Sequence, residues 1–137
     1  MTFDYSGICL VKNKLVLLAR RIEFYKGKPV PFGGYWSPFS GAIENGESAK
    51  DCAIRELREE SGFSINPKDV FFQKLIKRKK TNFNFFIGTV KEFPKIELDY
   101  EHTEFGIFKI NRLDTLSPVD EDVLKCLKKY YKNAFPE

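Results

Sequence analysis

Short apolar runs separated by turn-forming residues fill much of the chain, and this pattern predicts β-strands. Residues 5–11 and 15–21 are two such runs, and residues 12–14 form a predicted turn between them, so we expect a β-hairpin. Residues 22–34 are rich in glycine and proline and are expected to form a loop. Further strands are predicted near residues 35–40, 69–78, 83–90 and 104–110.

Two other segments have the spacing of helices. Residues 48–61 form the clearer one, because Ser48 is a good N-cap, Gly62 follows the last turn, and small or apolar side chains recur every four residues. Residues 120–131 form a second amphipathic helix. The order of strands, helix, strands and helix predicts one α/β domain over residues 1–137, without a regular strand–helix alternation.

The composition narrows the class of protein. The chain has 137 residues, of which 42% are hydrophobic and 31% charged, which is ordinary for a folded domain. No apolar run is long enough to span a bilayer, no secretion signal is visible, and the three cysteines form no CxxC pair. We therefore expect a cytoplasmic protein with reduced thiols, no membrane contact and no obligatory protein partner.

Histidine content and net charge point toward particular ligands. The one histidine, His102, cannot supply the imidazoles of the commonest catalytic zinc sites, so a metal site would use oxygen ligands and favour magnesium, manganese or calcium. The net charge of +4 suits polyanionic ligands such as nucleotides. Basic residues cluster at 74–80, where they could hold a phosphate chain or RNA, and at 125–132, where the spacing is that of a solvated helix face.

Three glutamates share one face of the first predicted helix. Glu56, Glu59 and Glu60 are spaced at i, i+3 and i+4, so they project together as a cluster of solvated carboxylates. Like charges at this spacing cost a few tenths of a kcal/mol per pair. A charged surface helix and a metal site are both consistent with the cluster taken alone.

The flanking sequence resembles the Nudix box, G-x5-E-x7-R-E-U-x-E-E-x-G-U, in which U is apolar. The fixed positions are all matched, by Gly41, Glu47, Arg55, Glu56, Leu57, Glu59, Glu60, Gly62 and Phe63. This resemblance to the Nudix hydrolase family implies an α/β/α sandwich with a mixed central sheet. It also implies hydrolysis of a nucleoside diphosphate linked to another moiety.

The same resemblance implies Mg2+ or Mn2+ as the cofactor. Glu59 and Glu60 would hold metal ions, which neutralise the charge of a pyrophosphate and polarise a phosphoryl oxygen. Glu56 would bind another ion or activate the attacking water.

Other positions of the box have supporting roles by the same resemblance. Arg55 would orient the carboxylates together with Glu47, and the backbone carbonyl of Ser40 would be a metal ligand. Gly41 and Gly62 would serve turn geometry and the helix C-cap. Ser40 stands where many relatives carry glycine, but a carbonyl ligand requires no particular side chain.

Relatives also use an acidic residue outside the box. Asp99, Glu101 and Glu104 are the candidates, and we select Glu101 as the additional catalytic residue. The neighbouring His102 is expected to lie on the surface or to order its loop.

The substrate is less constrained by the sequence. By position, Arg21 resembles a phosphate-binding arginine of MutT-like triphosphatases, and Asp120 resembles the residue that contacts the purine edge, although helix capping explains Asp120 equally well. Trp36, with Phe32 and Tyr35, could stack on a base or belong to the core.

A nucleoside triphosphate is the substrate we favour, because the chain starts directly at the first core strand. The predicted reaction converts NTP to NMP and pyrophosphate. The alternatives are hydrolysis of ADP-ribose, sugar nucleotides, dinucleoside polyphosphates or capped RNA. A non-catalytic nucleotide- or RNA-binding module is a further alternative.

Overall fold

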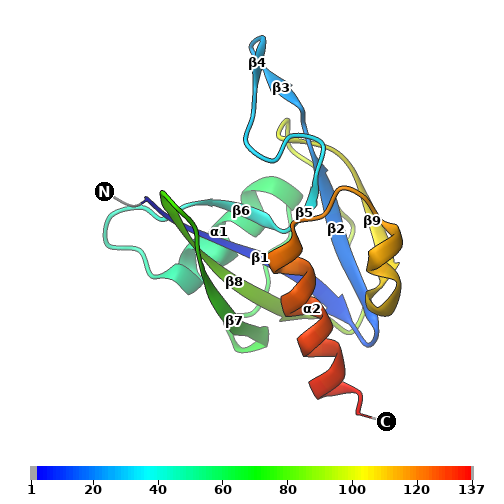
Figure 1. The fold of residues 1–137 in the computed structure, drawn as a ribbon. Helices are drawn as coiled ribbons and strands as arrows, with labels where there is room; N and C mark the ends of the chain where they lie inside the picture. Colours follow the sequence, from blue (N-terminus) through cyan, green and yellow to red (C-terminus); the bar gives the residue numbers. More distant parts are fainter. Residues whose placement is uncertain (1–2, 137) are drawn as a thin grey trace.

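The computed structural model describes residues 3–136 and is built on a seven-stranded mixed sheet (Figure 1). Its strands run in the order β5-β2-β1-β8-β7, with β6 pairing with β1 and β9 pairing with β2. Strand β1 is parallel to β8 but antiparallel to β2 and β6, which makes the sheet mixed. The strands are β1 (Phe3–Lys12), β2 (Leu15–Arg21), β5 (Trp36–Ser37), β6 (Phe39–Ala42), β7 (Val70–Lys77), β8 (Thr81–Thr89) and β9 (His102–Lys109).

The two helices cover opposite faces of this sheet (Figure 1). Helix α1 (Ala49–Ser61) packs Ala53 and Leu57 into one hydrophobic cluster, and α2 (Glu121–Ala134) packs Val123 and Leu127 into another. Two short 3-10 helices, η1 (Pro67–Asp69) and η2 (Ile110–Thr115), complete the elements outside the arm described below. The expected α/β/α sandwich is confirmed. Across residues 3–136, no helix is long and apolar enough to cross a membrane.

The ends of α1 are fixed by the signals that the sequence carries. The Ser48 hydroxyl accepts a hydrogen bond from the backbone N–H of Asp51 at 3.0 Å. At the other end Gly62 adopts a left-handed conformation with φ of 79°, and its N–H donates to the Arg58 carbonyl. The predicted helix over 48–61 therefore agrees closely with the structure, and its carboxylates are held in fixed positions against the sheet.

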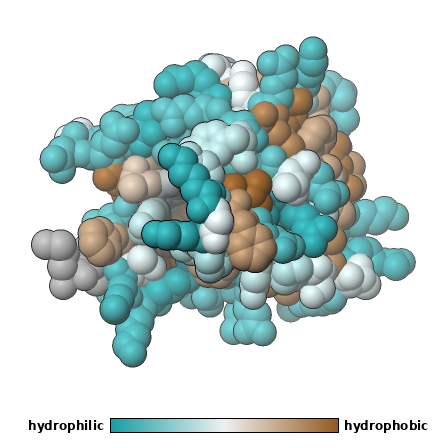
Figure 2. Space-filling model, turned by 90° about the horizontal axis from the view of Figure 1, so that it is seen from above, coloured by the Kyte–Doolittle hydropathy of each residue, from teal (hydrophilic) through white to brown (hydrophobic). Residues whose placement is uncertain are grey.

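The segment expected to be a loop, residues 22–34, contains a small hairpin. Strands β3 (Phe24–Tyr25) and β4 (Lys28–Pro29) pair and project from the body as an arm (Figure 1). Figure 2 looks down on the arm, and hydrophilic side chains predominate on this face while hydrophobic ones gather toward one side.

The single strand predicted near 35–40 is two strands. Pro38 interrupts the ladder, because its backbone has no N–H to donate. Strand β5 then pairs with β2, whereas β6 pairs with β1, in a register that places Ser40 opposite Gly7. The break brings Ser40 and Gly41 beneath helix α1.

Candidate active site

The carboxylates of α1 pack against the backbone of β6. Glu60 is only 1% exposed, and its Oε1 accepts a hydrogen bond from the backbone N–H of Ser40 at 3.2 Å. The Glu56 carboxylate lies so close to Gly41 that a Cβ at that position would overlap it. Gly41 is thus required for close approach, and not for turn geometry as the resemblance implied, since its φ is not left-handed.

Arg55 gathers the surrounding glutamates around its guanidinium. Its Nε and Nη2 donate to the two carboxylate oxygens of Glu47, at 2.7 and 3.0 Å. Its Nη1 donates to Glu56 at 2.9 Å and to Glu59 at 3.1 Å. This bidentate geometry orients the carboxylates and offsets their mutual repulsion. The geometry supports the orienting role predicted for Arg55 with Glu47.

The Glu47–Arg55 pair gives a testable effect on stability. Hydrogen bonding to Arg55 lowers the pKa of Glu47 to about 2, so the pair stabilises the fold above the ordinary pKa of 4.5, and this stabilisation is lost as pH falls toward 2. We expect Glu47→Gln to reduce the free energy of unfolding at neutral pH by about 1 kcal/mol, and by less near pH ~2. Urea denaturation at neutral pH and at the acidic pH measures the free energy of unfolding of the variant and the wild type.

The matched control for this variant is Glu44→Gln. Glu44 lies 3.6 Å from the same guanidinium but its side chain is 69% exposed, so its loss should cost less than about 0.5 kcal/mol. Equal losses of stability in Glu44→Gln and Glu47→Gln would contradict the assignment of this stabilisation to the Glu47–Arg55 pair. So would a loss in Glu47→Gln that is as large at acidic pH as at neutral pH.

Glu60 is buried, contrary to the expectation that all three glutamates are solvated. Burial, followed by the neighbouring Glu56 carboxyl, raises the pKa of Glu60 to about 11. The Nε2 of His102 lies 3.7 Å from Glu60 Oε1, and the Nδ1 of His102 is within 3.0 Å of Asp99 Oδ1. Burial lowers the pKa of this histidine. His102 is 6% exposed, so it does not lie on the surface; its contact with Asp99 orders the loop, and its ring also borders the buried carboxylate.

The donor set fits a divalent cation bound by oxygens. Among residues 3–136, Glu60 Oε2 is a buried acceptor without a hydrogen-bond partner. Such a group is costly unless a ligand satisfies it. Gly41 has no side chain, and the carboxylate of Glu56 occupies the space that a Cβ would fill. Glu56 is therefore a second carboxylate that packs against β6. Within the same described range no three acidic, histidine or cysteine side chains form a ready-made metal cluster, and Glu56 and Glu59 both contact Arg55.

Of the three acidic candidates outside the box, only Glu101 is left available to the site. Asp99 accepts a hydrogen bond from the backbone N–H of Glu101 and lies 3.0 Å from His102 Nδ1, while Glu104 lies 3.5 Å from Arg20. Burial and then the Asp99 charge raise the pKa of Glu101. The charge of Arg21 lowers this pKa and that of Glu56 raises it.

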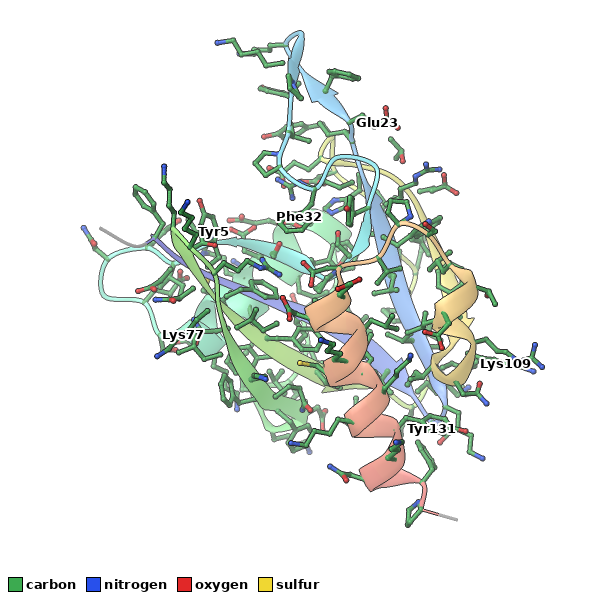
Figure 3. The ribbon with its side chains drawn as sticks, in the orientation of Figure 1. Tyr5, Glu23, Phe32, Lys77, Lys109 and Tyr131 are labelled. Carbon is green, nitrogen blue, oxygen red and sulfur yellow. The ribbon has the colours of Figure 1, made fainter. Side chains whose placement is uncertain are left out.

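A cavity of about 410 Å³ opens next to the carboxylates. Ser40 and Gly41 form part of its wall, and these are the residues that contact Glu60 and Glu56. Tyr5 and Phe32, both labelled in Figure 3, also line it. The remaining lining residues are Arg21, Pro31, Tyr35, Ser37, Pro38, Arg78, Thr81, Phe83, Asp120 and Val123.

The residues predicted to contact substrate divide into two groups. Arg21 and Asp120 line the same cavity, and Arg21 Nε is buried with no hydrogen-bond partner among residues 3–136. Trp36 does not line the cavity: it is 9% exposed and packs edge-on against Phe108 in the core. Aromatic contact with a ligand is therefore available from Phe32 and Tyr35 instead.

Arg78 is a cavity residue that the sequence did not single out. Its Nη2 donates to Asp120 at 2.6 Å, and its guanidinium lies over the rings of Phe32 and Phe83 at 4.9 and 5.6 Å. Asp120 also caps α2, accepting from the N–H groups of Asp122 and Val123. The capping interpretation is confirmed. The only local signal for Arg78 was its place in the basic cluster at 74–80, since its partner lies 42 positions away.

Comparison with known proteins agrees with this geometry. The family model described as the NUDIX domain matches residues 3–128. The chain belongs to the Nudix family. Among solved structures, the MutT protein from Methanosarcina mazei Go1 resembles this Nudix chain with a TM-score of 0.79 at 22% identity, covering 98% of this chain and 96% of that one.

Curated relatives match over shorter segments. Nudix hydrolase 25 of Arabidopsis thaliana is 42% identical over 57 residues, covering 41% of this chain and 28% of that protein. The NAD-capped RNA hydrolase NudC of Stutzerimonas stutzeri (strain A1501) is 37% identical over 59 residues, covering 42% and 21%. This Nudix chain therefore spans under a third of either relative's length in those matches.

Proposed function

We propose that the protein is a metal-dependent Nudix pyrophosphohydrolase that acts on nucleoside triphosphates, releasing NMP and pyrophosphate. The observation that carries the proposal is the shared wall formed by Ser40 and Gly41, which contact the buried carboxylates and also line the cavity. A nucleotide bound in the cavity would direct its phosphates at the carboxylates beyond this wall. The cavity volume of about 410 Å³ is in the range of small-molecule sites.

The residues have distinct roles in this proposal. Glu56, Glu59 and Glu60 would hold Mg2+ or Mn2+, with the Ser40 carbonyl as a further ligand. The cation would supply charge neutralisation and polarise a phosphoryl oxygen. Burial raises the pKa of Glu101, and a higher pKa makes a carboxylate a better acceptor for the proton of the attacking water.

A substrate panel tests the proposal. Purified protein is assayed with nucleoside triphosphates, oxidised dGTP, ADP-ribose, sugar nucleotides, dinucleoside polyphosphates and capped RNA, each with magnesium and with manganese. We expect triphosphates to have the highest kcat/KM, with NMP and pyrophosphate as products. Preference for another compound of the panel would overturn the proposed substrate class. Inactivity toward every compound would overturn the proposal that the protein is a hydrolase.

Two variants separate phosphate binding from base recognition. Arg21→Ala removes a charge-assisted contact common to all nucleotides, so kcat/KM should fall about tenfold or more for purines and pyrimidines alike. Asp120→Asn keeps a side-chain oxygen that caps α2 but removes the charge at the base edge, so purine preference should relax while pyrimidine turnover stays within about twofold.

Kinetics on purine and pyrimidine triphosphates compare the two variants. Equal losses for both bases in Asp120→Asn would leave Asp120 as a helix cap and a partner of Arg78. A base-dependent loss in Arg21→Ala would contradict its assignment to the phosphates.

A further inference from the structure

A second hollow is lined by residues of β7 and α2. Figure 1 shows where these two elements lie in the fold. The hollow has a volume of about 620 Å³. Strand β7 supplies one wall and α2 the other, and its lining residues are Gln73, Lys74, Ile76, Lys77, Asp122, Lys125, Cys126, Lys129, Tyr130, Asn133 and Ala134. We call this hollow the basic groove. None of these residues lines the cavity of about 410 Å³ beside the carboxylates, which we call the nucleotide cavity.

The basic groove joins the two lysine clusters of the sequence. Lys74 and Lys77 come from β7, Lys125 and Lys129 from α2, and Asp122 is the one carboxylate among the lining residues. Within residues 3–136 none of the four ammonium groups pairs with a carboxylate, although Lys128 on the same helix pairs with Asp114. Four unpaired cations that face one hollow make it a site for a polyanion.

The four lysines of the groove are exposed, whereas Cys126 between its walls is buried. Burial raises the pKa of the Cys126 thiol; the charges of Lys74 and Lys129 lower it, and those of Asp122 and Asp120 raise it. Cys126 is 9% exposed, so one cation from each wall acts on the same buried group. Lysines from both β7 and α2 therefore line one groove, whereas the interpretation favoured by the sequence was a solvated face of the helix alone.

The groove adjoins the nucleotide cavity. Lys77 precedes Arg78 along the chain, and Asp122 precedes Val123, and in each pair the first residue lines the groove while the second lines the cavity. Along α2, Lys125 and Lys129 are one turn apart, about 6 Å, and continue the line away from the cavity. A bound chain that leaves the cavity past Arg78 would therefore meet successive positive charges.

We propose that the basic groove binds the backbone of a single-stranded nucleic acid whose 5′ end reaches the nucleotide cavity. The continuity with a nucleotide site favours a nucleic acid over an acidic peptide, and the concave shape disfavours a flat membrane surface. Tyr130 adds a ring to the wall on which a base can stack. The placement of the 5′ end rests on the proposed function, whereas binding of the strand does not.

Fluorescence anisotropy with a labelled oligouridine tests the groove. A strand that contacts all four lysines releases counterions, so log Kd should vary with log salt with a slope of magnitude about 3. Lys125→Ala/Lys129→Ala should reduce this slope by about 1.4 and weaken binding at least about tenfold at low salt. Lys132→Ala is the matched control, because Lys132 lies on the same helix but lines a different hollow, beside η2.

Each result has a defined consequence. A weakening by Lys132→Ala equal to that of the double variant, no salt-dependent binding, or equal affinity for polyglutamate or anionic vesicles would overturn the proposal. Turnover of free triphosphates should be unchanged in the double variant. Strand binding without turnover of any nucleotide would overturn the proposed function, and with it the placement of the 5′ end, but not binding of the strand in the groove. Triphosphate turnover without strand binding would overturn the role of the groove alone.

Discussion

Glu59→Gln and Glu60→Gln should each lower turnover by at least about 10²-fold. A bound cation that stabilises the charge of the reacting phosphates is worth several kcal/mol, and replacing a carboxylate ligand by an amide weakens it. Glu59 is half-exposed and within 3.1 Å of Arg55, whereas Glu60 is buried against Ser40, so two different environments serve the same proposed ion site. Steady-state kinetics with saturating magnesium measures the loss.

The two variants should differ in stability when a chelator removes divalent metal. The raised pKa of Glu60, about 11, means that the folded protein binds more protons than the unfolded chain between pH ~4.5 and ~11. The free energy of unfolding therefore falls as pH rises through that window. Glu60→Gln removes the ionisable group that causes this fall. Near pH ~8 the variant should therefore have a free energy of unfolding at least about 1 kcal/mol higher than the wild type. Glu59→Gln should leave the free energy of unfolding nearly unchanged.

Glu92→Gln is the matched control for both measurements, because Glu92 is an exposed carboxylate that pairs with Lys12, far from the site in sequence. It should change neither turnover nor metal-free stability. Unchanged turnover in both Glu59→Gln and Glu60→Gln would show that the active site lies elsewhere. A metal-free Glu60→Gln protein less stable than the wild type would contradict the buried, protonated state assigned to this carboxyl.

Local signals explain which parts of the fold the sequence predicts well. Helix α1 begins and ends where Ser48 and Gly62 place it, and the hairpin of β1 and β2 turns at Asn13, which adopts a left-handed φ of 52°. The glutamates of the box follow from helical spacing alone, because three residues at i, i+3 and i+4 must share a face. These features depend on neighbours in the chain, so sequence patterns are sufficient.

Features that depend on distant residues were not predicted. Spacing alone does not reveal that β6 covers Glu60, so a solvated carboxylate was the expectation for a residue that is 1% exposed. The pairing of Arg78 with Asp120 and the burial of Trp36 against Phe108 likewise depend on how strands from separate parts of the chain meet. Aromatic composition could not distinguish a core tryptophan from one that stacks on a ligand.

Gly41→Ala should reduce turnover by about 10²-fold in a protein that still folds. The added Cβ would overlap the carboxylate of Glu56, which must then move away from both Arg55 and the strand. Displacement of a catalytic group by about 1 Å costs a factor of that order. The backbone of Gly41 is not left-handed, so alanine adds a steric conflict without backbone strain.

A double-mutant cycle distinguishes this steric effect from general damage to the strand. If Gly41→Ala acts only by displacing Glu56, then Gly41→Ala/Glu56→Ala should be no less active than Glu56→Ala alone, because the second change removes the side chain that the new methyl group would strike. Additive losses in the cycle would show that Gly41 supports the site through β6 itself. Circular dichroism and the midpoint of thermal unfolding, measured on the same proteins, verify that each variant is folded.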